Sequence, residues 1–114
     1  MMTVQELIRR TGWQMLTQAA DEAVTSGYVC DMLSWVMARA QAGTAWITVQ
    51  AHVNVVAVAA LTGCACVIVP DGINVSEETL SAAREKGVCL IAAPCTSFGA
   101  AAVLHDLGVG EVAQ

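Results

Sequence analysis

The sequence predicts a three-layer α/β/α fold built on a mostly parallel central sheet of about five strands. Three short apolar runs rich in β-branched residues each stop at a cluster of small or polar side chains, after which a helix-like segment follows. These runs are Ala45–Val49, Cys66–Val69 and Val88–Ala93. Strands buried on both faces read as continuous apolar runs, and crossover helices between parallel strands cover those faces. The alternation therefore indicates strands joined by right-handed helical crossovers.

Helix caps, glycines and apolar periodicity mark the individual elements. Thr3 and Glu6 form a capping box, and Asp31 and Ser76 stand where helix N-caps are expected. Residues 53–62 mix valines with alanines, but a segment between two parallel strands is most often helical. In chain order we expect a helix at 4–10, strands at 13–16 and 23–30, a helix at 32–40 ended by Gly43, a strand at 45–49, a helix at 53–62, a strand at 65–69, a helix at 77–86, a strand at 88–92, a helix at 97–107 and a loose tail from Gly108.

The composition describes an apolar, weakly acidic chain whose 114 residues fit one domain, 1–114. Hydrophobic residues make up 56% and charged residues 13%, against about 45–50% and about 25% in an average globular protein. Part of the apolar surface is therefore expected to be covered by a second copy, which gives a homodimer. The aromatic candidates for such a dimer face, with the core as the competing location, are Trp13, Tyr28, Trp35 and Trp46.

Charge and hydropathy argue against nucleic acid and membrane partners. A net charge of −5 with five Lys and Arg lacks the basic surface that binds phosphate backbones. The stretch between Arg39 and Asp71 has no charged side chain, but polar residues interrupt it and no basic cluster anchors either end. The first residues do not resemble a signal peptide. We therefore expect a cytoplasmic protein.

Five cysteines occur without a CxxC pair, and in a reducing cytosol such residues usually act as small buried apolar side chains. Cys64 and Cys66 would share one face of a strand, and with Cys95 they could bind a metal, so a cysteine-based metal or redox protein is the alternative function. A Cys-dependent enzyme would need a base near Cys95, for which His52 is the candidate. There is no glycine-rich phosphate loop, paired-carboxylate motif or metal-ligand spacing, so we expect neither an enzyme nor a cofactor.

Several short motifs between Ala45 and Leu107 resemble the DRTGG domain family: the polar turn after the first run, Pro70-Asp71-Gly72, Lys86-Gly87 and the helix start Thr96-Ser97-Phe98. The segment Val24–Ser34 is similar to the opening half of its small stand-alone members, whereas Gln50–Asn54 replaces the Asp-Arg-Thr-Gly-Gly signature. The resemblance implies a fold similar to the N-terminal domain of HPr kinase/phosphorylase. It also implies a dimerising or regulatory role, as in some phosphate acetyltransferases and inorganic pyrophosphatases. Bacterial stand-alone relatives are often encoded beside iron hydrogenase and sensor kinase components in anaerobes, which implies a partner redox enzyme or sensor kinase.

Polar side chains follow each expected parallel strand at its carboxyl end, where ligands of open α/β sheets bind. Helices begin at the same edge, and their free amides favour anionic groups. Gln50, His52 and Asn54 interrupt an uncharged stretch and need hydrogen-bond partners. We therefore expect a non-catalytic regulatory or sensory domain that dimerises and either binds a small anionic ligand, such as a nucleotide, or docks on a partner enzyme. The candidate ligand-binding residues are Asp31, Ser34, Gln50, His52, Asn54, Asp71, Thr96 and Ser97.

Overall fold

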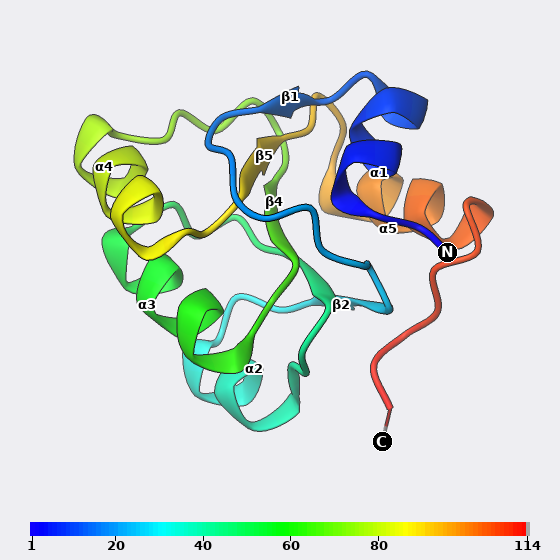
Figure 1. Ribbon diagram of the computed structural model, residues 1–114, viewed down its shortest axis with the longest axis horizontal. Coiled ribbons are helices and arrows are strands. Elements are labelled where there is room, and N and C mark those ends of the chain that lie inside the picture. The colour runs from blue at the N-terminus through cyan, green and yellow to red at the C-terminus, as the bar shows by residue number, and fades with distance from the viewer. Residues whose placement is uncertain (114) are drawn as a thin grey trace.

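A five-stranded sheet lies between two layers of helices in the computed structural model, which describes residues 1–113 (Figure 1). The strand order is β1-β5-β4-β3-β2, with β1 antiparallel to β5 and all other neighbours parallel. None of the helices in this part of the chain is long and apolar enough to cross a membrane. The elements are α1 (Val4–Thr11), β1 (Gln14–Met15), β2 (Ser26–Val29), α2 (Leu33–Arg39), β3 (Thr44–Ile47), α3 (Val53–Thr62), β4 (Cys66–Val69), α4 (Glu77–Lys86), β5 (Leu90–Ala92) and α5 (Ser97–Asp106).

Helices cover both faces of the sheet. Figure 1 shows α2, α3 and α4 on one side and α1 and α5 on the other. Each side has its own core, one around Trp46 and Val56 and the other around Leu7 and Ile68. Every residue of β3 and β4 is buried, which explains why these strands read as continuous apolar runs. The α/β fold class and the mostly parallel sheet expected from the sequence are confirmed.

Local sequence signals set several helix boundaries as expected. Thr3 Oγ1 accepts a hydrogen bond from the Glu6 amide at 3.2 Å, and Ser76 caps α4. Gly63 and Gly87 end α3 and α4 in the left-handed conformation, with φ of 76° and 68°. The helix α3 has the expected bounds despite its valines, because the crossover between β3 and β4 requires a covering helix.

The start of α2 differs from the expectation. Asp31 does not cap this helix: Met32 occupies the N-cap position and makes no side-chain capping bond. The Asp31 carboxylate instead accepts hydrogen bonds from Thr48 Oγ1 at 2.8 Å and from the Val49 amide at 2.9 Å. The helix is also shorter than 32–40 and ends before Gly43, because Ala40 takes the C-cap position. Asp31 therefore binds the loop that follows the neighbouring strand β3 and does not cap α2.

The C-terminal segment is not the loose tail that its glycines suggested. Val109 and Val112 are buried, and the Gly27 amide of β2 donates to the Gly110 carbonyl at 2.7 Å. Gly27 and Glu111 form an isolated parallel bridge. Burial of the apolar side chains of Val109 and Val112 thus stabilises the packing of this segment against the outer edge of the sheet.

The tryptophans divide between the core and the surface. Trp46 is completely buried, and its indole Nε1 donates to the Cys30 carbonyl at 2.8 Å. Trp13 is buried on the opposite face of the sheet, whereas Trp35 is 52% exposed. The sequence left core and interface open for these residues, and the structure places Trp13 and Trp46 in the core.

A buried threonine ties the segment after β1 to β5. The Thr17 hydroxyl donates to the Val88 carbonyl at 2.7 Å and accepts from the Leu90 amide at 2.9 Å. Both backbone groups are buried, so this one hydroxyl satisfies two groups that have no access to water.

Replacing Thr17 by valine keeps the shape of the side chain but removes both hydrogen bonds. We expect Thr17→Val to lower the free energy of unfolding by about 1–3 kcal/mol, because a buried donor and acceptor lose their partner. Urea denaturation followed by tryptophan fluorescence measures this change. Thr17→Ser keeps the hydroxyl and is expected to lose less; equal losses in the two variants would contradict the role given to the hydrogen bonds.

Candidate functional site

The structure places all the candidate ligand-binding residues beyond the carboxyl ends of the parallel strands. Asp31 and Ser34 follow β2, Gln50, His52 and Asn54 follow β3, Asp71 follows β4, and Thr96 and Ser97 follow β5. Neighbouring strands lie about 4.8 Å apart, so the groups that follow β2 and β5 are separated by about 14 Å. The residues share one edge of the sheet, but they divide into three local groups.

The first group fastens the loop after β2 to the loop after β3. Asp31 accepts from Thr48 and Val49, as described above, and the Gln50 side-chain amide donates to the Asp31 carbonyl at 3.2 Å. The Gln50 backbone amide in turn donates to Thr48 Oγ1 at 3.1 Å. Asp31 therefore forms hydrogen bonds to the loop after β3, and Gln50 forms one to the loop after β2. Both side chains have a structural role, because they hold the two loops together.

The second group lies at the start of α3. His52 is the N-cap, and its Nδ1 accepts a hydrogen bond from the Asn54 amide at 3.1 Å. The Ala51 carbonyl accepts from Thr79 Oγ1 at 3.0 Å, which fixes this turn against α4. The side chains of His52 and Asn54 are exposed. They are the polar groups that a ligand at the N-terminus of α3 would meet.

The third group lies between β4 and β5, whose following helices cover opposite faces of the sheet. A crevice for ligands forms at such a position in many α/β proteins. Here the Asp71 amide donates to the Cys95 carbonyl at 2.8 Å, and this hydrogen bond joins the two loops. Asp71 has a φ of 62°, a conformation that few residues other than glycine adopt. Thr96 caps α5 by accepting from the Gly99 amide at 3.2 Å.

Basic side chains lie away from the start of α3. Arg39, Arg84 and Lys86 occupy the last turns of α2 and α4. Both helices begin at the carboxyl edge, so these last turns lie at the opposite edge of the sheet. Arg9 and Arg10 end α1, which leads into β1 beside β5. A ligand at the start of α3 would therefore be recognised by helix amides and His52, without a lysine or arginine among the described residues beside it.

The expectation that Cys64 and Cys66 share a strand face is wrong. β4 begins at Cys66, while Cys64 precedes the strand and lies 3.3 Å from Thr62 Oγ1. Cys66 packs in the core beneath α1 and α5, whereas Cys64 packs against the core on the other side. Burial raises the pKa of Cys64, raises that of Cys66 well above its ordinary range and raises that of Cys89 to about 11. Within residues 1–113, no three His, Cys, Asp or Glu side chains gather as a metal ion requires.

The helix α2 exposes large apolar side chains, of which the sequence singles out only Trp35, as a candidate for a dimer face. Only Val36 of this helix is fully buried. Met32 at its N-cap is 57% exposed, Trp35 is 52% exposed and Met37 is 49% exposed. The Arg39 guanidinium lies 4.6 Å from the centroid of the Trp35 ring, at cation–π distance. Met32, Trp35 and Arg39 are spaced three and four residues apart and lie on one side of the helix, and we call these three residues the α2 surface. Met37 is two residues from Trp35 and therefore points to another side.

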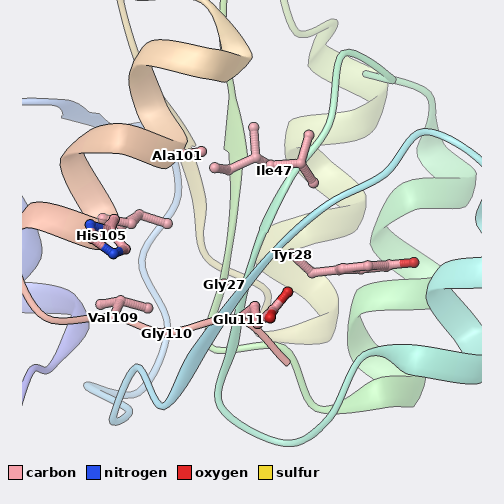
Figure 2. A pocket seen from close by; sticks show the side chains of 10 residues that line it. Gly27, Tyr28, Ile47, Ala101, His105, Val109, Gly110 and Glu111 are labelled. Atoms are coloured by element: carbon pink, nitrogen blue, oxygen red, sulfur yellow. The ribbon is translucent and has the colours of Figure 1, made fainter. Parts of the chain in front are cut away.

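A cavity of about 420 Å³ lies away from the candidate residues, between β2, α5 and the C-terminal segment (Figure 2). None of the candidate ligand-binding residues lines it. One signal in the sequence was available: a glycine inside a strand often marks a place where something approaches the backbone closely. The residues that line the cavity include Gly27, Val29, Ile47, Leu104, His105, Val109 and Glu111.

No family model matches the chain, and no curated protein matches it. Among solved structures, the chain is similar to the CBS and DRTGG domains of the regulatory region of Clostridium perfringens pyrophosphatase, complexed with the activator diadenosine tetraphosphate. The TM-score is 0.70 over 90% of this chain, at 15% sequence identity, and the chain spans 45% of that structure, less than half of its length. Similarity at this identity shows a shared fold, in agreement with the resemblance to DRTGG domains.

Proposed function

We propose that the protein is a non-catalytic regulatory domain that forms a homodimer through the α2 surface and docks on a partner enzyme. The observation that carries this proposal is the exposure of Met32 and Trp35, one turn apart on a helix with a single fully buried residue. Contiguous apolar surface of this kind marks interaction sites on soluble proteins. The polar candidates Asp31 and Gln50 instead form hydrogen bonds that join the loops after β2 and β3.

The chemistry of the α2 surface suits an interface between copies. Aromatic residues, Met and Arg are enriched at protein interfaces, and Trp and Arg are enriched at the positions that contribute most binding energy. A two-fold axis near α2 would bring the same apolar side chains of two copies together. Arg39 is the only charged residue in α2, so little repulsion opposes this pairing. Charged residues make up only 13% of the whole chain, which also favours an interface between two copies.

The regulatory part of the proposal is supported by the fold. The similar structure belongs to the regulatory region of an enzyme. The resemblance to small stand-alone DRTGG proteins suggests the kind of partner, a redox enzyme or sensor kinase of an anaerobic bacterium. In this proposal the dimer is the unit that docks, and the candidate residues at the carboxyl edge hold the loops that present the α2 surface.

The dimer is tested by replacing the aromatic centre of the α2 surface with a charge. We expect the wild-type chain to sediment as a dimer and Trp35→Glu to raise the dimer dissociation constant at least about 30-fold, or about 2 kcal/mol, the cost typical of a central interface residue. Analytical ultracentrifugation over a range of concentrations measures this constant. The matched control is Leu61→Glu, which changes a residue 71% exposed on α3. A monomeric wild-type protein, or equal effects of the two substitutions, would contradict the proposed dimer.

A small anionic ligand at the start of α3 is the second candidate function. It is favoured by the exposed pair His52 and Asn54 at the N-terminus of a helix of 10 residues, where amide groups favour negative charge. The similar structure is complexed with a nucleotide, diadenosine tetraphosphate. A nucleotide is therefore the ligand class that we propose for this position.

Titration with ATP and with inorganic phosphate tests this second function. We expect ATP to shift the NMR amide resonances of Val53 and Asn54, and His52→Ala to weaken binding at least about 5-fold by removing the cap and the imidazole. His105→Ala is the control, because this second histidine of the chain is exposed on α5. Unchanged ATP affinity in His52→Ala, or an equal loss in His105→Ala, would contradict this site.

The cysteine alternative predicts reactive thiols, whereas the structure predicts protected ones. We expect iodoacetamide to leave Cys66 and Cys89 unmodified in the native protein at about pH 8, because burial excludes the reagent and raises their pKa. Raising the pH to about 9 activates an ordinary cysteine, but Cys89 should stay protonated because its pKa is raised to about 11. Peptide mass spectrometry reads the labelling. Rapid native labelling of Cys66, or stoichiometric metal in the purified protein, would favour the alternative.

A further inference from the structure

The cavity beside β2 is a built feature of the fold. Its volume of about 420 Å³ lies within the range of about 300–1,000 Å³ that small-molecule sites occupy. Figure 2 shows Ile47 and Ala101 at one end of it and Val109, Gly110 and Glu111 at the other, with β2 running along its side. Its walls therefore come from β2 with the neighbouring Ile47 of β3, from α5 and from the C-terminal segment.

Gly27 makes room for this cavity. A Cβ atom at this position would lie 3.4 Å from Leu104 Cδ1 and 3.7 Å from Val109 Cγ1, so any larger side chain would fill the space between β2 and α5. The Gly27 amide also holds the Gly110 carbonyl at 2.7 Å, which fixes the segment that closes the cavity on one side. The lack of a side chain at Gly27 thus leaves space for the cavity, and the backbone amide of Gly27 holds the C-terminal segment in place.

The outer edge of β2 offers polar backbone groups to the cavity. The Cys30 amide donates to Ile47 of β3 at 3.2 Å, and backbone groups of successive strand residues point to alternate sides. The amide and carbonyl of Val29 therefore point away from β3, toward the outer edge where Gly27 binds Gly110. Val29 lines the cavity, so an occupant can pair with these groups as an additional strand would.

The charge of the cavity favours a cation. The Tyr28 ring points away from the cavity in Figure 2 and packs on the opposite face of the sheet. The other titratable side chains among the described residues of the lining are Glu111 and His105, both exposed to solvent, and these lining residues include no lysine or arginine. Apolar groups make up most of the remaining wall, from Ile47, Leu104 and Val109 among others. A carboxylate beside an apolar wall attracts a protonated amine and repels an anion.

We infer that this cavity binds a small amphipathic cation, in which an aromatic or branched apolar body fills the space between β2 and α5 and a protonated amine pairs with Glu111. The site is separate from the α2 surface and from the start of α3. It takes ligands of the charge opposite to that of the nucleotide proposed for α3. Its specificity comes from the carboxylate, the apolar wall and the open backbone edge at Val29.

Three probes of similar shape test the charge preference: phenethylamine, 3-phenylpropionate and 3-phenylpropan-1-ol. They are titrated into the full chain at about pH 8, and NMR amide shifts are followed. We expect phenethylamine to shift Gly27, Val29, Gly110 and Glu111, and to bind at least about 10-fold more tightly than 3-phenylpropionate, with the alcohol between them. Shifts that map to other residues, or equal affinity for the amine and the carboxylate, would overturn the inference.

Two substitutions separate the charge of the site from its shape. Glu111→Gln should weaken phenethylamine about 10-fold and leave the alcohol unchanged, whereas Glu85→Gln makes the same change of net charge on α4 and should alter neither. Gly27→Ala keeps an ordinary backbone conformation and adds a methyl group at contact distance, so the chain should fold and bind all three probes more weakly. Equal behaviour of Glu111→Gln and Glu85→Gln, or undiminished binding by Gly27→Ala, would count against the site.

Discussion

Burial of β3 and β4 on both faces is the constraint on which the rest of the structure depends. All residues of these strands are buried, so each face of the sheet needs a layer of helices. Even the polar Thr44 fits this rule, because its hydroxyl contacts Ser26 Oγ at 3.1 Å and accepts from the Gln41 amide at 2.9 Å. The chain must then cross from strand to strand over a face, and its polar residues collect in the loops at the carboxyl edge.

The same topology explains why these polar residues do not form one pocket. The three helices that follow β2, β3 and β4 cover a single face (Figure 1), so their loops follow one another along the edge without opening a crevice. The crossing to the other face occurs after β5, and there the Asp71 amide joins the Cys95 carbonyl. Asp31 binds the loop after β3, and His52 and Thr96 cap α3 and α5. The places that remain available for binding therefore lie apart from one another: the α2 surface, the start of α3 at His52 and Asn54, and the cavity beside β2.

The sequence predicted what depends on local rules and on the spacing of strands. α3 was correctly expected as a helix, because its place between β3 and β4 outweighed its valines. Asp31 was misassigned because a capping residue is recognised locally, whereas its actual partners Thr48 and Val49 lie in the loop after β3. Residues two apart share a face only inside a strand. The expectation for Cys64 and Cys66 failed because β4 begins at Cys66. Gly27 in β2 is the one local signal of the cavity, whose other walls, like the attachment of the C-terminal segment, depend on contacts between distant residues.

The strand β2 lies between the α2 surface and the cavity. Residues of a strand alternate between its faces, so Tyr28 packs on the side of α2, whereas Gly27 and Val29 line the cavity on the side of α5. As an edge strand, β2 pairs with β3 on one side and is held on the other by the bond between Gly27 and Gly110. It is therefore easier to displace than β3 or β4, which have strands on both sides. A shift of β2 would therefore move residues at both places at once, Tyr28 on the side of α2 and Gly27 and Val29 in the cavity.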